Sequence, residues 1–419
     1  MQIALPGRWS AHYLWTRWAK SAVPADESTE LKVLVLAPNS WAGQWVNRQQ
    51  LFSRLGVHLH VLYSTGGWFT WDRSDPAWQQ ARWSGRFMRH DNVWVDESPR
   101  VLLRAPRLGV FDDLMLRLQI SRWRRFLRSL GNGPVVAYIF HPMFLPYVKG
   151  LRADLLVYHA YDLYQHTPGW TEELERAERE LLRQAGLVVA ASEQIARVLR
   201  TKVNREVRVL PNGADVDAFT RAASLACPPT DLACIPHPRL GWVGSLHPQV
   251  DYGLVAELAR RRNDWHFVLV GNIVATADAR AEAEMAACRE LANVHFLGAK
   301  PVDAIANYLI YMDVNLMFYR LAEESWIMSG YPLKLHEYLA AGQPVVSVDL
   351  PSVRPFSHVV QIANGPDEWQ EAIEMALSQG GRGSRHDRVA VAGENSWSNR
   401  VTTLRAWLTS LISATKSEN

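Results

Sequence analysis

The most informative stretch of this sequence is PLKLHEYLAAGQPVV, residues 332–346. Its leucines and alanines recur at helical spacing, Gly342 follows them, and Pro344 opens a short apolar run. Glycine is favoured just past the end of a helix, and proline cannot continue one. The stretch therefore predicts a helix, with Pro332 at its first position, followed by a buried strand.

The same alternation of apolar runs and helical stretches recurs along the chain. Predicted strands are 31–37, 57–63, 135–140, 155–159, 187–191, 240–243, 266–270, 294–297, 314–318 and 344–348. Predicted helices include 45–55, 170–184, 255–262, 279–291 and 396–411. Strands rich in Val and Leu, separated by helices, indicate βαβ units and parallel sheets. Two such series predict an α/β protein with two Rossmann-like, doubly wound domains.

The boundary between the two series is expected near Pro211-Asn212-Gly213, because proline cannot extend a central strand and Asn-Gly turns the chain. The expected order is an N-terminal extension (1–30), a first domain (31–208), a second domain (209–390) and a C-terminal segment (391–419). The helix in this last segment is expected to pack back on the first domain.

Composition excludes several classes of protein. The chain has 419 residues, of which 48% are hydrophobic and 21% charged, so it can build full cores and is not a disordered polymer. No apolar run approaches the roughly 20 residues of a membrane-spanning helix, and the N-terminus lacks the pattern of a secretion signal. Three cysteines without metal-ligand spacing favour a reducing cytoplasm.

Positive charge is concentrated in the first half of the chain. Residues 1–210 hold 28 Lys and Arg against 19 Asp and Glu, and the remainder holds 17 against 23. The segment from Arg82 to Arg128 has eleven arginines against five acids, with several tryptophans nearby. Arginine with tryptophan suits an anionic membrane surface or a sugar–phosphate ligand. The alternative is a solvated arginine-rich helix face over core tryptophans. No nucleic-acid recognition motif accompanies the patch, so nucleic acid is not the expected partner.

Lys334 and Glu337 are the strongest candidates for a binding site. The helix dipole disfavours a cation in the first turn of a helix unless an anion is bound there. A pyrophosphate at this helix end would explain Lys334, and Glu337, one turn on, could accept hydrogen bonds from ribose hydroxyls. Gly241 and Gly244 suit a turn close to phosphate, although they do not form a full dinucleotide-binding fingerprint.

Candidates in the first half follow predicted strands. Trp41 and Trp45 could stack on a sugar face, with Arg48 on the helix behind them; the alternative is an ordinary strand–helix loop with one core tryptophan. His141 could donate to a sugar hydroxyl or transfer a proton, or could satisfy a backbone carbonyl. Asp162 lies between aromatic residues and suits a general base, or else caps the next turn.

These stretches resemble a known family. Residues 332–346 look like the donor-site helix of GT-B glycosyltransferases of bacterial cell-surface polysaccharide assembly. Residues 211–219 (PNGADVDAF) resemble the interdomain segment of the same group, and residues 41–50, 241–245 and 265–271 also resemble family counterparts.

The resemblance implies a GT-B fold in which two Rossmann-like domains face each other across a cleft. The second domain would bind a nucleotide-diphosphate sugar and the first a glycan or lipid-linked acceptor. By matching position, Lys334 would contact the diphosphate and Glu337 the ribose, while Gly244 and Ser245 would approach the phosphates. Leu333 is expected to belong to the same nucleotide-binding set. No metal or other cofactor is implied. The enzyme would be cytoplasmic, in peripheral contact with the inner face of the plasma membrane.

Two departures from the family pattern leave alternatives open. Relatives resembling glycosyltransferase family 4 carry a glutamate where this chain has Ser329, and a basic pair where it has the sequence from Leu246 to Gln249. Retaining and inverting transfer both remain open, with Asp162 the candidate base of an inverting enzyme like xanthan glucuronosyltransferase. The alternatives are a nucleotide-sugar 2-epimerase of the same fold and a degenerate, non-catalytic glycosyltransferase subunit that binds glycan or a partner.

Overall fold

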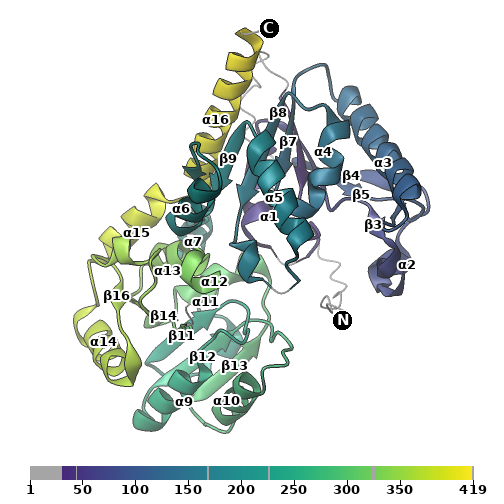
Figure 1. Cartoon of the computed structure of the whole chain (residues 1–419). Coiled ribbons are helices and arrows are strands. Elements are labelled where there is room, and N and C mark those ends of the chain that lie inside the picture. Colours follow the sequence, from purple (N-terminus) through teal and green to yellow (C-terminus); the bar gives the residue numbers. More distant parts are fainter. Residues whose placement is uncertain (1–30, 44, 168, 225–226, 322–325, 418–419) are drawn as a thin grey trace. The chain divides into compact units, whose positions relative to one another are not determined.

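The computed structural model describes residues 31–417 apart from 44, 168, 225–226 and 322–325 (Figure 1). The predicted extension, 1–30, lies outside the described residues. Contacts divide the chain into two compact units, Met1–Val157 with Leu411–Asn419, and Tyr158–Ser410. No helix in the described part of the chain combines the length and the apolar character needed to cross a bilayer.

The first sheet has eight strands in the order β10-β9-β8-β7-β1-β2-β5-β4. Its strands are β1 (Lys32–Leu36), β2 (His60–Ser64), β4 (Arg86–His90), β5 (Val93–Glu97), β7 (Val135–Ile139), β8 (Leu155–Ala160), β9 (Leu187–Ala190) and β10 (Arg208–Val209). β1 is fully buried and pairs in parallel with β2 and β7, as expected for a Val/Leu-rich central strand. At the edge, β4 pairs antiparallel with β5. A separate pair joins β3 (Trp68–Phe69) to β6 (Leu103–Arg104).

Helices connect these strands. They are α1 (Asn47–Leu55), α2 (Pro76–Gln80), α3 (Gly109–Ser129), α4 (Leu145–Leu151), α5 (Glu172–Gln184) and α6 (Glu193–Lys202). Short 3₁₀ turns are η1 (Thr70–Ser74), η2 (Pro142–Phe144) and η3 (Tyr164–His166). Side-chain caps explain where several helices start: the Thr171 hydroxyl accepts from Leu174 N before α5, and the Ser192 hydroxyl accepts from Ile195 N before α6.

The second sheet is parallel throughout, in the order β13-β12-β11-β14-β15-β16. Its strands are β11 (Arg239–Val243), β12 (His266–Val270), β13 (Val294–Gly298), β14 (Val314–Met317), β15 (Val345–Ser347) and β16 (Gln361–Ile362). Numbered from its own first strand, this is the order 3-2-1-4-5-6 of a dinucleotide-binding fold. Strand order reverses between β11 and β14, and ligands of such sheets bind beyond the carboxyl ends of the strands at that point.

Helices alternate with the strands of the second sheet. They are α7 (Val216–Ala223), α8 (Thr230–Ala233), α9 (Tyr252–Arg261), α10 (Ala279–Arg289), α11 (Ile305–Leu309), α12 (Trp326–Ser329), α13 (Lys334–Ala341), α14 (Gly365–Gln379), α15 (Arg385–Glu394) and α16 (Trp397–Ser417), with 3₁₀ turns η4 (Val302–Ala304) and η5 (Arg354–Phe356). The core around this sheet contains the fully buried rings of Trp242, Trp265 and Trp369.

The ten predicted strands correspond to β1, β2, β7, β8, β9, β11, β12, β13, β14 and β15, with small differences at their ends. Prediction missed the shorter strands β3, β6, β10 and β16 and the antiparallel edge pair β4–β5. α13 begins at Lys334 rather than at Pro332, because Leu333 is its N-cap and Leu335 N bonds Pro332 O in the preceding turn. Gly342 ends α13 in the left-handed conformation, as predicted (φ 78°).

The predicted domain limits remain predictions. β10 ends at Val209 beside the expected boundary, whereas the division by contacts falls inside β8. The C-terminal helix α16 makes one contact that bears on its expected packing: the Arg208 guanidinium in β10 lies 5.3 Å from the centre of the Trp407 ring.

Candidate functional site

Lys334 lies at the switch point of the second sheet. α13 presents its side chain to the loop after β11, and the Lys334 Nζ lies 4.3 Å from the centre of the Trp242 ring and 5.8 Å from that of Tyr319, which follows β14. An ammonium over aromatic faces is stabilised as a cation without being neutralised. The helix predicted around Lys334 is present as α13, and the sheet order places this helix where a ligand is expected.

Gly244 makes room for the lysine. Its backbone has φ +140°, a conformation that side chains rarely adopt, and a Cβ built there would lie 2.4 Å from the Lys334 Nζ and 2.6 Å from its Cε. The loop is fixed by neighbouring bonds: Gly244 N donates to Val270 O, and the Ser245 hydroxyl donates to Asn272 Oδ1 at 3.1 Å. Gly244 therefore brings the backbone against the cation, which is the close approach expected beside phosphate.

Burial shifts the ionisation of Lys334 and Glu337 in opposite directions. Desolvation lowers the pKa of Lys334 to about 8, although the Glu337 carboxylate opposes the shift. Desolvation raises the pKa of Glu337 to about 7; the lysine opposes this shift and Asp215 adds to it. Perturbed pairs of this kind are concentrated at functional sites. A bound anion would stabilise the charged form of Lys334, and a bound hydrogen-bond donor would stabilise the charged form of Glu337.

Lys334 and Glu337 also lack hydrogen-bonded or ion-paired partners among the described residues. They lie one turn apart on α13 and are partly exposed, yet neither makes a hydrogen bond or ion pair with any residue that the structure describes. A half-buried amine and carboxylate normally pair with each other or with a neighbour. Here the ammonium is available to an anion, and the carboxylate is available to a hydroxyl donor such as ribose.

Three further residues enclose the site and were not predicted as part of it. Trp242 and Tyr319 flank the ammonium, as described above. His247 follows the loop, with its ring centre 6.2 Å from that of Tyr319. Burial and the Lys334 charge lower the pKa of His247 to about 4, so it is neutral at pH 7. His247 lies in the stretch where the family resemblance predicts a basic pair, and its packing beside Lys334 means that it adds no charge at pH 7.

A hydrogen-bonded chain supports the start of α13. Asn212, from the PNG turn, donates through Nδ2 to Tyr331 O at 2.6 Å and to the Tyr161 hydroxyl at 2.6 Å. The Tyr331 hydroxyl and His336 Nε2 lie 2.7 Å apart. Asn212 therefore ties the loop after β8 to the loop before α13. This gives the PNG turn a structural role beyond the domain connection predicted from its sequence.

Ser329 is built into the support of this region. It stands where the family resemblance predicts a glutamate, and its carbonyl accepts a buried hydrogen bond from the Ser192 hydroxyl. Its own hydroxyl donates to Trp326 O at 3.2 Å. The Ser329 hydroxyl is thus committed to the backbone of α12.

The roles predicted for Asp162 and Leu333 remain predictions. Asp162 follows β8, directly after Tyr161, and is half-buried. Leu333 is the N-cap of α13 and makes no side-chain capping bond. It places Lys334 at the first helical residue, whose backbone N–H has no partner within the helix.

The predicted residues of the first half gather at the other sheet's switch point, beyond β1 and β7. Arg48 is buried; its Nη1 donates to Asn39 Oδ1 at 2.6 Å, and its guanidinium lies 5.0 Å from the centre of the Phe140 ring. His141 Nδ1 accepts from Met143 N at 3.2 Å. Burial, followed by the Arg48 charge, lowers the pKa of His141 to about 4. His141 is therefore neutral at pH 7, which suits a hydrogen-bond donor to a hydroxyl.

The two loop tryptophans differ in exposure. Trp41 is only 7% exposed, and its ring packs edge-on against Tyr63, with centres 5.0 Å apart. Trp45 is partly exposed and lies 6.0 Å from the Trp41 ring. Of the two, Trp45 has more free ring surface for a sugar face.

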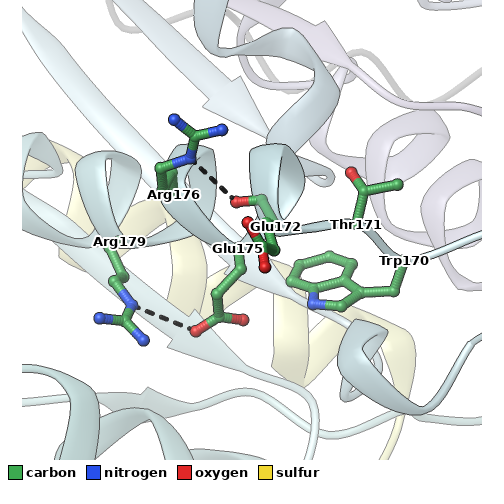
Figure 2. Close-up of a pocket in the computed structure, with 6 residues that line it drawn as sticks. All are labelled: Trp170, Thr171, Glu172, Glu175, Arg176 and Arg179. Atoms are coloured by element: carbon green, nitrogen blue, oxygen red, sulfur yellow. Dashed lines mark hydrogen bonds and ion pairs between the residues drawn. The ribbon is translucent and has the colours of Figure 1, made fainter.

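A shallow pocket of about 430 Å³ lies elsewhere, at the start of α5 (Figure 2). Its lining consists of Trp170, Thr171, Glu172, Glu175, Arg176 and Arg179. Both of these arginines form hydrogen bonds within the helix: Arg176 Nε donates to Glu172 O, and Arg179 Nε donates to Glu175 Oε1. None of the predicted site residues lines this pocket. Among the described residues, no group of three or more His, Cys, Asp and Glu is placed to hold a metal ion.

Comparison with known proteins agrees with this geometry. Residues 237–379, which contain the second sheet and α13, match the family model for glycosyl transferases group 1. The structure of Anabaena HepE with UDP has a TM-score of 0.66 at 15% identity, over 91% of this chain and 100% of HepE. The fold is GT-B.

A second solved structure has a similar fold, and one further protein is similar in sequence. The trehalose 6-phosphate synthase of Burkholderia multivorans has a TM-score of 0.63 at 13% identity, over 93% of this chain and 98% of the synthase. In sequence, the chain is 26% identical over 215 residues to Bacillus subtilis TuaH, which is named as a glycosyltransferase of teichuronic acid biosynthesis. That match spans 50% of this chain and 52% of TuaH, about half the length of each.

Proposed function

We propose that this protein transfers a sugar from a nucleotide-diphosphate sugar to a glycan or lipid-linked acceptor in the assembly of a surface polysaccharide. The observation that carries the proposal is the pair Lys334 and Glu337, half-buried, unpaired with any described residue, and set at the switch point of a GT-B sheet. The match of residues 237–379 to glycosyl transferases group 1, and the UDP and UDP-glucose bound by HepE, support a uridine diphosphate donor.

The proposed chemistry assigns a task to each charged group. An acceptor hydroxyl attacks the anomeric carbon, the bond from that carbon to the diphosphate oxygen breaks, and Asp162 takes the hydroxyl proton. Lys334 and the first N–H groups of α13 balance the negative charge that grows on the departing diphosphate. Glu337 holds the ribose. Neutral His141 donates to the acceptor, with Trp45 and Arg48 shaping its binding surface. The reaction as proposed needs no cofactor besides the donor.

The proposed setting is the cytoplasmic side of the plasma membrane, where a lipid-linked acceptor would be presented. The arginine-rich segment between Arg82 and Arg128 supports peripheral contact with anionic lipid. The similarity to TuaH, which is named as a glycosyltransferase of teichuronic acid biosynthesis, supports the assignment to a surface polysaccharide.

The test is a transfer assay with radiolabelled UDP-sugars, run with and without a membrane-extracted acceptor. We expect label to enter the lipid or glycan fraction only when acceptor is present. Isomerisation of the donor sugar without acceptor would identify an epimerase instead. Saturable UDP binding without transfer to any acceptor would identify a non-catalytic subunit, and absence of UDP binding would remove the donor-site assignment.

A further inference from the structure

The long helix α3 carries apolar side chains on its outer face. Leucine, valine and phenylalanine residues there are exposed far beyond what a core-facing helix requires: Leu108 61%, Val110 89%, Phe111 43%, Leu114 51% and Leu118 46%. Phe111, Leu114 and Leu118 follow one another at helical spacing and so form a single stripe along the first half of α3, with Leu108, its N-cap, and Val110 at the start of the helix. We call the five residues the α3 stripe.

The exposure of the α3 stripe does not arise from a loosely held helix. On the opposite face, Trp123 is fully buried and its Nε1 donates to Asp96 at 2.6 Å. Near the start of α3, Asp112 accepts two bonds from the buried Arg104 guanidinium, at 2.7 and 2.8 Å. The helix runs along β4 and β5 (Figure 1), and Phe126 stacks on Phe87 of β4 with ring centres 4.0 Å apart. The inner face is thus complete, and the outer stripe has no packing role within the described residues.

Positive charge continues the stripe along the helix. Arg117, Arg125 and Arg128 of α3 and Arg107, just before it, are exposed, against one exposed acid on the helix, Asp113. Arg117 adjoins Leu118 in the sequence, and Arg125 lies two turns beyond Leu118, so cationic side chains border the α3 stripe and continue the outer face towards the end of α3. Arginine can pair with the phosphate groups of lipids while leucine and phenylalanine enter the boundary of the acyl chains.

We propose that the outer face of α3 is the surface by which this protein docks on an anionic membrane, with the α3 stripe inserted at the interface and its arginines bound to lipid phosphate. The inference rests on the membrane contact of the proposed function and adds the surface and residues that make it. Charge decides the occupant: a face with four exposed arginines and one acid repels a second copy of itself and complements anionic lipid.

The experiment is co-sedimentation of the full chain with vesicles of phosphatidylcholine, with or without phosphatidylglycerol, at low and high salt. Wild-type protein is expected to bind the phosphatidylglycerol vesicles, more weakly as salt rises. The double variant Leu114→Glu, Leu118→Glu prevents insertion of the α3 stripe into the membrane interface. The double variant Arg117→Glu, Arg125→Glu reverses the charge beside the stripe. Each double variant is expected to reduce the fraction of protein bound to vesicles by about tenfold or more.

Two controls isolate the surface. Val57→Glu replaces an apolar side chain that is 62% exposed but lies outside α3, and Arg176→Glu with Arg179→Glu reverses two exposed arginines of α5. Both controls should bind vesicles as wild type does. Circular dichroism and thermal unfolding of every variant show that it is folded.

The proposal is overturned if the α3 variants bind as well as wild type, if neutral and anionic vesicles bind equally, or if wild type ignores vesicles and instead forms a dimer that the Leu114→Glu, Leu118→Glu variant disrupts. UDP binding is measured on the same samples. Loss of vesicle binding with UDP binding retained is the expected result for the α3 variants. A wild type that binds vesicles but not UDP would contradict the proposed transfer while leaving the docking surface intact.

Discussion

Raising the pH from 7 to 9 should weaken the binding of UDP to this protein. Burial lowers the pKa of Lys334 to about 8, so the side chain is about nine-tenths charged at pH 7 and about one-tenth charged at pH 9. Only the ammonium form attracts a diphosphate. The apparent dissociation constant should therefore rise by roughly tenfold over this interval, whereas a lysine with an ordinary pKa would leave it unchanged.

Isothermal titration calorimetry at pH 7, 8 and 9 measures this change. The interval lies above the second ionisation of a phosphate, at a pKa of about 6, so the ligand's phosphate charge stays nearly constant. Glu337, whose pKa burial raises to about 7, also ionises within this interval, so its contribution is separated from that of Lys334 by substitution. Glu337→Gln should keep most of the pH dependence, because that dependence belongs to Lys334.

Lys334→Met is the matched control. It should bind UDP weakly at pH 7 and show little further loss up to pH 9. The reasoning is refuted if wild-type affinity stays constant between pH 7 and 9, or if Lys334→Met retains the wild-type fall.

Two further substitutions test the rest of the site. Gly244→Ala should weaken UDP binding by about tenfold, because the new Cβ would lie 2.4 Å from the Lys334 Nζ on a backbone at φ +140° and displace the ammonium. The control is Gly393→Ala, where a Cβ meets nothing within 4 Å. Equal affinities of wild type and Gly244→Ala for UDP, measured by calorimetry, would rule out the contact. Asp162→Asn should keep the UDP affinity within about twofold of wild type and lower the transfer rate by about 100-fold or more, because the proposed base acts only in the chemical step. Undiminished transfer in the radiolabel assay would exclude Asp162 as the base.

The parallel sheets were predictable because their strands are short, rich in Val and Leu, and punctuated by Gly and Pro. The segment from His266 to Val270 was predicted at its observed limits as β12. The antiparallel edge strands β4 and β5 were missed, since Arg86–His90 is mostly polar and partly or fully exposed. Its pairing depends on β5 and on the Phe87–Phe126 stack, neither of which is local in sequence.

The candidate site could be predicted from the sequence where the chemistry of a residue follows from its position on one helix. Lys334 is anomalous in the first turn of α13, and this could be recognised without coordinates. The neighbours of Lys334 could not be recognised from the sequence, because Trp242 lies in β11 and Tyr319 follows β14. The two rings meet the lysine only through the strand order β11-β14. The bonds of Asn212 to Tyr161 and Tyr331 are similarly long-range. The α3 stripe escaped notice because leucines at helical spacing usually face a core, and only exposure shows that these do not.

The central claim is that the Lys334 ammonium holds the diphosphate of a nucleotide donor, and UDP titration at pH 7 tests it most directly. Lys334→Met is compared with Lys149→Met, which removes an exposed lysine from α4. A charge-assisted contact contributes about 1.5–3 kcal/mol, so Lys334→Met should weaken UDP binding by roughly 10- to 100-fold while Lys149→Met binds as wild type does. Equal affinities of wild type and Lys334→Met for UDP would contradict the account.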